Sequence, residues 1–269
     1  MIYQYFNGPI MKLTQEILLL DGPKKGGADN NNSQFFLKNN SILNIQNGAE
    51  VRVKRGSRLL LESGSKLQLE NGALVIIEDD GFVEYSQGAQ IYLNGSNSVM
   101  EINGQLKLND NSIFTFLPTT GSHGYFLFGS SLSPSRNIVA GLNCSIDLKS
   151  SSSNNKILEI VQETFYAPDN LVQLKLNNGK VVLHPNSRLQ PDGLATSVDF
   201  NNVRFTSNTP GSNNGHRGVH LYGQQNISIS TCTFEYGKYG IFSYQTYGGA
   251  PLNLLGCIFR HNEIGIRAY

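Results

Sequence analysis

The sequence predicts an all-β fold: a right-handed three-sided parallel β-helix, which is a solenoid of stacked strands, with an N-terminal cap. Three observations predict it. A glycine recurs at eight-residue spacing, aliphatic residues alternate after each of these glycines, and whole phrases recur at a fixed offset near the C-terminus. Each repeat is too short to bury its own apolar face, so copies of it must stack on one another.

The eight-residue repeat reads Gly-[Ala/Ser]-x-aliphatic-x-aliphatic-x-x, and its glycines are Gly48, Gly56, Gly64, Gly72 and Gly88. An apolar period of two residues is that of a strand with one buried face. Glycine lets the backbone turn where a Cβ would interfere. Each glycine is therefore expected at a corner between two short strands.

The coil length follows from both repeats. Three eight-residue sides give a coil of about 24 residues. Near the C-terminus, Cys-Thr-Phe at residues 232–234 recurs as Cys-Ile-Phe at 257–259, and Gly-Ile at 240–241 recurs at 265–266, which is nearly the same length. A left-handed hexapeptide helix needs about 18 residues per coil. The hairpins of an antiparallel sandwich or barrel would not repeat whole phrases, so the right-handed parallel β-helix is preferred.

The sequence divides into two segments. Residues 1–35 lack the repeat and are assigned to an N-terminal cap and polar loop, because the open end of a solenoid is a row of unpaired strand edges that needs cover. Residues 36–269 are assigned to the parallel β-helix. The strand-like pattern runs to Tyr269 with no cap after it. The helix is therefore expected to be truncated there, with further coils or a protein partner at its C-terminal end.

Composition and charge exclude several classes of protein. Charged residues make up 15% of the chain, Gly is abundant at 28 residues, and Trp is absent. This balance fits a solenoid with small and polar corner residues. A net charge of +1 gives no electrostatic reason to bind nucleic acid. No apolar run reaches the roughly 18 residues of a membrane span, and the N-terminal residues do not read as a signal peptide.

The three cysteines, Cys144, Cys232 and Cys257, are odd in number and widely spaced, which argues against a disulfide framework. Cys232 and Cys257 fall at equivalent positions on neighbouring coils. We expect them to be two stacked, buried thiols. No His/Cys spacing indicates a metal site, and no cofactor is predicted.

One row of side chains is a candidate binding site. His220, Phe242 and Arg267 each lie two residues after a corner glycine, and strand alternation directs them outward. We expect them to stack about 4.8 Å apart, with Tyr222 and Tyr244 near the following corners. Aromatic rings can stack on sugars, and arginine pairs with carboxylates. These five residues are therefore candidate binding residues for a polysaccharide or cell-surface glycan. The alternative is an ordinary row of solvent-facing side chains with no ligand.

The phrases at residues 229–234 and 254–259, with the Gly-Ile pairs after them, resemble the right-handed parallel β-helix repeat family of the pectin-lyase-like superfold. Residues 178–189, with the preceding glycine repeat, resemble β-helical regions of large secreted bacterial surface proteins. The resemblance implies a non-catalytic extracellular segment, secreted or at the cell surface: a stalk, adhesin or passenger region that can bind glycans. The superfold also hosts polysaccharide lyases and glycoside hydrolases. An exported component docked in a larger complex is a further alternative.

The motifs of the superfold's hydrolases are incomplete in this chain. Inverting hydrolysis needs two carboxyl groups on either side of the glycosidic bond. Residues 79–80 are an Asp pair, and residues 215–218 (Gly-His-Arg-Gly) loosely resemble one hydrolase motif, but the Asn-Thr-Asp motif is missing. The acidic residues Asp199, Glu235 and Glu263 are scattered over separate coils. The sequence therefore favours a non-catalytic protein, and no catalytic residue is assigned.

Overall fold

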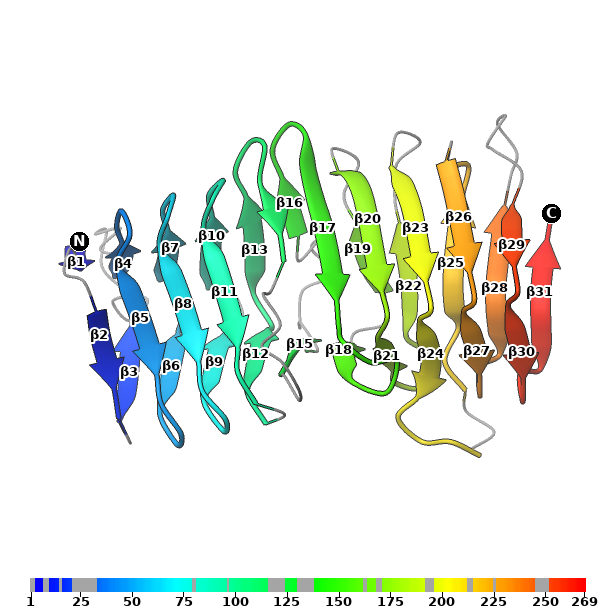
Figure 1. Cartoon of the computed structure of the whole chain (residues 1–269), viewed down its shortest axis with the longest axis horizontal. Helices are drawn as coiled ribbons and strands as arrows, with labels where there is room; N and C mark the ends of the chain where they lie inside the picture. The colour runs from blue at the N-terminus through cyan, green and yellow to red at the C-terminus, as the bar shows by residue number, and fades with distance from the viewer. Residues whose placement is uncertain are drawn as a thin grey trace. The chain divides into compact units, whose positions relative to one another are not determined.

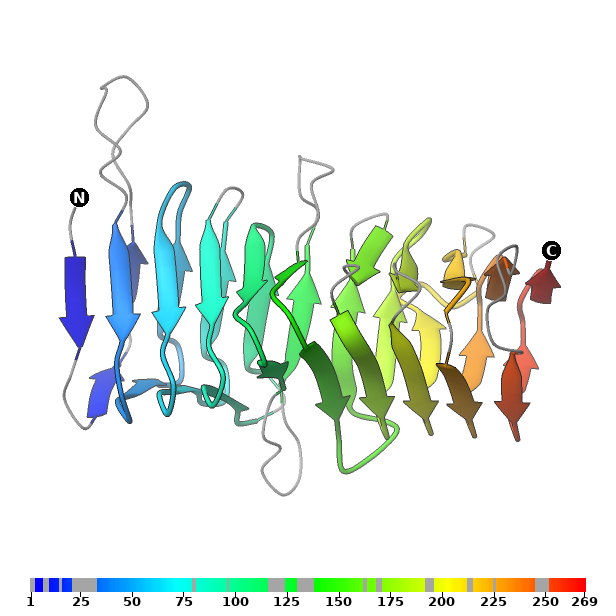
Figure 2. The same ribbon diagram turned by 90° about the horizontal axis from the view of Figure 1, so that it is seen from above.

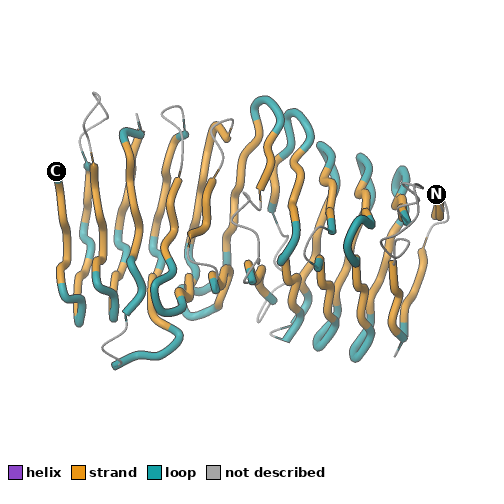
Figure 3. Tube along the Cα trace, turned by 180° about the vertical axis from the view of Figure 1, so that it is seen from behind, coloured by secondary structure: helices purple, strands orange, loops and turns teal. Residues whose placement is uncertain are grey.

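The computed structural model describes residues 3–6, 10–14, 16–20, 33–78, 81–95, 97–115, 124–129, 138–161, 164–167, 171–191, 196–211, 215–224, 226–244 and 252–269. These residues form strands and the loops between them (Figure 3), and no helix among them could cross a membrane. The strands pair in parallel and stack turn upon turn. The predicted all-β solenoid is confirmed.

Two compact units divide the chain. The first consists of Met1–Phe126 and Ser131–Val139, and the second consists of Leu127–Ser130 and Ala140–Tyr269. The strands β15 (Tyr125–Phe128) and β16 (Ile138–Ala140) contain the points where this division falls. Within each unit the strands belong to three stacks.

In the first unit the strands from Tyr3–Phe6 to Phe82–Tyr85 each pair with the strand three places further along the chain, so three strands make one turn (Figure 1). One stack contains β1 (Tyr3–Phe6), β4 (Gln34–Leu37), β7 (Arg58–Leu61), β10 (Phe82–Tyr85) and β13 (Gln105–Leu108). The next contains β2 (Ile10–Leu13), β5 (Ile42–Ile45), β8 (Lys66–Leu69) and β11 (Gln90–Leu93). The third contains β3 (Ile17–Leu20), β6 (Glu50–Val53), β9 (Leu74–Ile77) and β12 (Val99–Ile102), and a short β14 (Ile113–Phe114) follows β13.

The register of these stacks confirms the expected coil length. Ile42 of β5 pairs with Lys66 of β8, and Lys66 pairs with Gln90 of β11, so each step equals three sides of the eight-residue repeat. Side chains alternate between the two sides of each strand. The inward residues Leu43 and Leu67 are fully buried, so the aliphatic pairs of the repeat form the core.

The corner glycines adopt the conformation that the repeat predicts. Gly48 has a φ of 79° and Gly72 a φ of 78°. Both values lie in the left-handed region, which glycine enters without the steric cost that other residues meet. The alanines after them, Ala49 and Ala73, are buried. A side chain larger than Ala or Ser at this position would have to fit into the closed corner, which explains the second letter of the repeat.

The segment assigned to the N-terminal cap contains strands of the solenoid. Its strands β1, β2 and β3 pair in parallel with β4, β5 and β6. Leu13 and Leu20 are buried, as inward residues of a turn should be. The strands β1, β2 and β3 therefore belong to the stacks of the solenoid, although they lie in the segment that the sequence assigned to a cap.

The second unit is built in the same way (Figure 2). One stack contains β17 (Cys144–Lys149), β20 (Leu171–Asn177), β23 (Ser197–Asn201), β26 (Asn226–Ser230) and β29 (Asn253–Leu255). The next contains β18 (Lys156–Ile160), β21 (Lys180–Leu183), β24 (Arg204–Ser207), β27 (Thr233–Glu235) and β30 (Ile258–Arg260). The third contains β19 (Thr164–Ala167), β22 (Arg188–Pro191), β25 (Gly218–Tyr222), β28 (Tyr239–Tyr244) and β31 (Ile264–Ala268).

The phrases that recur near the C-terminus place phenylalanines on top of one another. The ring centroids of Phe205 and Phe234 lie 4.9 Å apart with an interplanar angle of 1°. Those of Phe234 and Phe259 lie 5.0 Å apart with an angle of 10°. Phe205 and Phe234 are fully buried, so this stack forms part of the core of the second unit.

The cysteines are free thiols, as expected, but their burial differs. Cys232 is fully buried, and this burial raises the pKa of its thiol to about 12. Cys257 is only half-buried, so the expected pair of buried thiols is correct for Cys232 alone. The difference arises because Cys257 belongs to the last turn of the chain, where no further strand of the described residues pairs with β30.

Candidate functional site

The structure places His220, Phe242 and Arg267 in one row on the outer side of β25, β28 and β31. His220 pairs in register with Phe242, and Phe242 pairs with Arg267. The neighbouring residues Val219 and Ile241 are fully buried on the inner side of these strands. The rings of His220 and Phe242 stack with their centroids 4.8 Å apart and an interplanar angle of 18°.

His220 lies on the outer side of its strand but does not face solvent as expected, since only 5% of it is exposed. Its Nε2 donates to the backbone oxygen of Arg217 at 2.9 Å. Burial lowers the pKa of His220 to about 4, and the nearby positive charges of Arg188 and Arg217 lower it as well. The imidazole is therefore neutral at pH 7, and its ring packs against Phe242 with its one donor already in use.

A second row, made of tyrosines, runs beside the first. Tyr222 pairs with Tyr244, and their ring centroids lie 6.1 Å apart. Tyr269 continues the row, 6.2 Å from Tyr244 between centroids. Tyr244 is 40% exposed and Tyr269 is 58% exposed, so this row is open to solvent. Tyr269 was not predicted from the sequence, although it follows Tyr244 at the same offset that separates the recurring phrases.

Arg267 is held in place by two tyrosines. Its guanidinium lies 4.8 Å from the ring centroid of Tyr269 and 5.8 Å from that of Tyr239. Its Nη1 donates to the Tyr239 hydroxyl at 3.1 Å. Cations over aromatic faces are attracted by the ring quadrupole. Within the described part of the chain Arg267 has no acidic partner, so its charge stays available to a ligand.

We call this surface the aromatic face: His220, Tyr222, Tyr239, Phe242, Tyr244, Arg267 and Tyr269. Tyr239 was missed because it directly precedes a corner glycine, where strand alternation does not say which way a side chain points. Its ring centroid lies 5.5 Å from that of Phe242. The face therefore brings together the five predicted residues and two further tyrosines.

The acidic residues considered for catalysis are not gathered at one place. Glu235 is fully buried and accepts hydrogen bonds from Nε of Arg204 and, at 2.6 Å, from Nε of Arg260. Burial alone would raise the pKa of Glu235, but the two arginines outweigh it and hold that pKa below its usual value. Both oxygens of the Glu235 carboxylate are therefore engaged in ion pairs. Asp199 pairs with Lys175, and the Asp pair at residues 79–80 lies outside the described residues.

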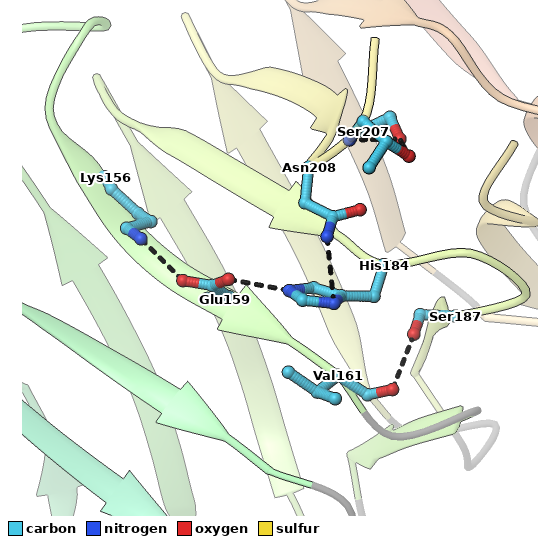
Figure 4. A network of polar contacts seen from close by, with 8 residues as sticks. Lys156, Glu159, Val161, His184, Ser187, Ser207 and Asn208 are labelled. Atoms are coloured by element: carbon cyan, nitrogen blue, oxygen red, sulfur yellow. Dashed lines mark hydrogen bonds and ion pairs between the residues drawn. The ribbon is translucent and has the colours of Figure 1, made fainter. Parts of the chain in front are cut away.

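Another polar network crosses the outer side of β18 and the residues after β21 and β24 (Figure 4). Glu159 accepts from Lys156 Nζ at 2.5 Å and from His184 Nε2 at 2.7 Å, and His184 Nδ1 lies 3.0 Å from Asn208 Nδ2. Burial disfavours the charged form of Glu159, yet these partners lower its pKa. Among the described residues His184 makes no hydrogen bond to a hydroxyl or thiol that it could activate as a nucleophile. The network therefore connects neighbouring turns of the solenoid.

No group of three or more His, Cys, Asp or Glu side chains within the described ranges is placed to hold a metal ion. No protein-family model and no curated protein matches the chain. Among solved structures, a TibC-catalyzed hyper-glycosylated TibA55-350 fragment is similar with a TM-score of 0.19 and 11% identity, over 100% of this chain and 95% of that chain. A similarity this low assigns no function.

Proposed function

We propose that this chain is a non-catalytic, extracellular β-helix segment of a surface protein, and that it binds a glycan on its aromatic face. The observation that carries the proposal is the pair of aromatic rows on β25, β28 and β31. Phe242 and Arg267 stand beside Tyr244 and Tyr269, which are open to solvent. A solenoid that displays such rows on stacked strands acts as a rigid support for a binding surface.

The chemistry of the face suits a sugar chain. Tyrosine combines a large apolar ring with a hydroxyl that can hydrogen-bond to a sugar. The rings of Phe242 and Tyr239 pack edge to face, and Arg267 is fixed over two rings, so little freedom is lost when a ligand binds. Stacked strands repeat at a spacing of about 4.8 Å, so the tyrosine row offers a linear polymer a series of similar contacts.

The state of Glu235 supports a non-catalytic role. A glycosidase needs a carboxylic acid that can give its proton to the leaving oxygen. Glu235 has its pKa lowered and both of its oxygens occupied by arginines. It is therefore ionised and covered, which is the opposite of what a general acid requires.

Binding to a panel of neutral and acidic polysaccharides, measured by calorimetry, tests the proposal. Phe242→Ala removes the central ring of the face and should weaken binding about tenfold, the loss of an aromatic contact worth ~1.4 kcal/mol. Its thermal midpoint should change little, because Phe242 is half-buried on the outer side of its strand.

Phe82→Ala is the matched control. Phe82 is also a half-buried, outward phenylalanine, but it lies on β10 in the first unit. We expect this variant to bind as the unmodified protein does. The proposal is wrong if no polysaccharide binds, or if the two variants lose affinity equally.

A further inference from the structure

Arg267 uses little of its hydrogen-bonding capacity within the protein. A guanidinium carries five N–H donors, and Arg267 directs one of them, from Nη1, to the Tyr239 hydroxyl. Its Nε and Nη2 make no hydrogen bond with the residues that the structure describes, and neither atom is buried. These two nitrogens form one edge of the planar guanidinium. That edge is therefore accessible from solvent and offers two neighbouring donors.

Arg58 in the first unit shows the contrasting arrangement. Its guanidinium also lies over a ring, 5.5 Å from the ring centroid of Phe82. Its Nε, however, is buried and makes no hydrogen bond. A ligand cannot reach that atom from outside. The two arginines thus share the contact with an aromatic ring and differ in the accessibility of their donors, so Arg58 supplies a matched control.

The charge of Arg267 is not balanced on the aromatic face. The seven residues of the face include no Asp or Glu, and burial keeps His220 neutral at pH 7 by lowering its pKa to about 4. Phe242, the register partner of Arg267, is apolar. Among the described residues Arg267 forms no ion pair. The face therefore presents one positive charge, and a ligand can supply the counter-charge.

The accessible donors lie beside the exposed tyrosine row. The guanidinium is 4.8 Å from the ring centroid of Tyr269, which is 58% exposed and lies next to the 40% exposed Tyr244. Aromatic rings of this kind pack against the apolar faces of sugars. A sugar on the tyrosine row is therefore within reach of the free edge of Arg267.

We propose that Arg267 makes the aromatic face selective for acidic sugars, by pairing its free edge with a sugar carboxylate. Nε–H and Nη2–H donate to the two carboxylate oxygens, while the sugar ring packs on the tyrosine row. A guanidinium matches a carboxylate in both charge and shape, and paired donors of this kind give the stronger, charge-assisted hydrogen bonds. This inference rests on the proposed function and adds the class of sugar.

The test compares an acidic polysaccharide, polyglucuronate, with the same polymer after its carboxyl groups are reduced to alcohols. We expect the unmodified protein to bind the acidic polymer about tenfold more tightly, as for a charge-assisted hydrogen bond. Arg267→Gln should lose this preference and keep its affinity for the reduced polymer. Arg267→Lys, which keeps the charge but not the paired donors, should retain part of the preference. Arg58→Gln is the control and should keep all of it.

A second measurement reports on the donors directly. The Nε–H signal of Arg267 in the NMR spectrum, assigned by its absence from Arg267→Lys, should shift when glucuronate is added. Glucose, which has no carboxylate, should leave that signal where it is. The Nε–H signal of Arg58 should respond to neither sugar, because its nitrogen is buried.

The outcomes separate this inference from the proposed function. Equal binding of both polymers by the unmodified protein would overturn the selectivity for acidic sugars and leave glycan binding intact. Binding of neither polymer nor any other glycan would overturn the proposed function. If Arg267→Gln lost affinity for both polymers equally, Arg267 would only hold the tyrosines in place. If Arg58→Gln lost the preference as fully as Arg267→Gln, the effect would be one of overall charge. Either result would overturn the assignment to Arg267.

Discussion

At the scale of single residues, two buried histidines are held in their neutral form. His216 is fully buried, and its Nε2 donates to the backbone oxygen of Glu235 at 3.0 Å. Burial lowers the pKa of His216 to about 4, as it does for His220. Both side chains therefore resist protonation in the folded state while the unfolded chain accepts protons readily.

This difference predicts that acid destabilises the protein. Between pH 6.5 and about 4 the unfolded state binds more protons than the folded state, so the free energy of unfolding falls as the pH is lowered. At pH 5 each of these two histidines should lower the free energy of unfolding by about 2 kcal/mol relative to its value at pH 7. Urea unfolding at the two pH values measures the loss.

His216→Gln should remove about half of this pH dependence, because glutamine keeps a donor for Glu235 but does not titrate. His261 is exposed, so His261→Gln should leave the pH dependence unchanged. An identical pH dependence in the unmodified protein and His216→Gln would contradict the assignment. Glu159 and Glu235 have lowered pKa values, so their contribution is lost at more acidic pH, below the ordinary value of 4.5.

At the scale of strands and corners, two glycines with the same backbone conformation have different surroundings. Gly48 has a φ of 79°, and a Cβ there would meet nothing within 4 Å. Gly218 has a φ of 80°, but a Cβ there would collide with the backbone oxygens of Tyr239 and Gly240 in the next turn. The first corner is constrained by conformation alone, and the second also by close packing of turns.

We therefore expect Gly48→Ala to lower the free energy of unfolding by about 1–2 kcal/mol, the cost of a left-handed alanine. Gly218→Ala should lower the free energy of unfolding by at least twice as much. Its Cβ would collide with backbone oxygens, which cannot rotate away as a side chain can. Chemical denaturation of both variants makes the comparison. Equal losses would mean that the turn carrying Tyr239 moves aside easily.

Much of the solenoid could be predicted from its repeats. A period of two residues identifies the strands, and a glycine before each one identifies the corner, so residues such as Val51 and Val53 are correctly expected in the core. The strands β1, β2 and β3 were not predicted, because residues 1–35 do not carry the regular series of eight-residue repeats and these strands are recognised only by their pairing with β4, β5 and β6. Strand pairing leaves little trace in a sequence when the corners are irregular.

The candidate site could be predicted only in part. Equal distances from corner glycines were enough to align His220, Phe242 and Arg267 in one row. Alternation distinguishes the inner from the outer side of a strand, but it does not say whether an outer residue is covered. The covering of His220 depends on side-chain positions in neighbouring turns, which no local pattern encodes.

At the scale of the whole molecule, each strand pairs with strands of the turns before and after it. Phe234 of β27, for example, pairs with Phe205 and Phe259 of the adjacent turns. In such repeat folds stability is approximately a sum of nearest-neighbour terms. A local defect should therefore loosen the turns around it more than distant ones.

Phe234→Ala tests this expectation. Removing a fully buried phenylalanine should cost about 3–5 kcal/mol. Hydrogen exchange followed by mass spectrometry should show faster exchange in β24, β27 and β30, with β5 and β8 of the first unit unchanged. A uniform increase along the chain would show that both units open together and would contradict the nearest-neighbour description.

The number of residues between paired strands varies along the chain, but the stacking of the strands stays regular. Lys180 pairs with Arg204, and Arg204 pairs with Thr233 after a longer stretch of chain, yet both pairs are parallel and in register. The additional residues lie between the end of β24 and the start of β25, and the strands that follow still pair in line. A foreign peptide grafted at such a corner would be presented to solvent without moving the surface rows. The same property lets a gene gain or lose segments at its corners while the register of the stacked strands is inherited unchanged.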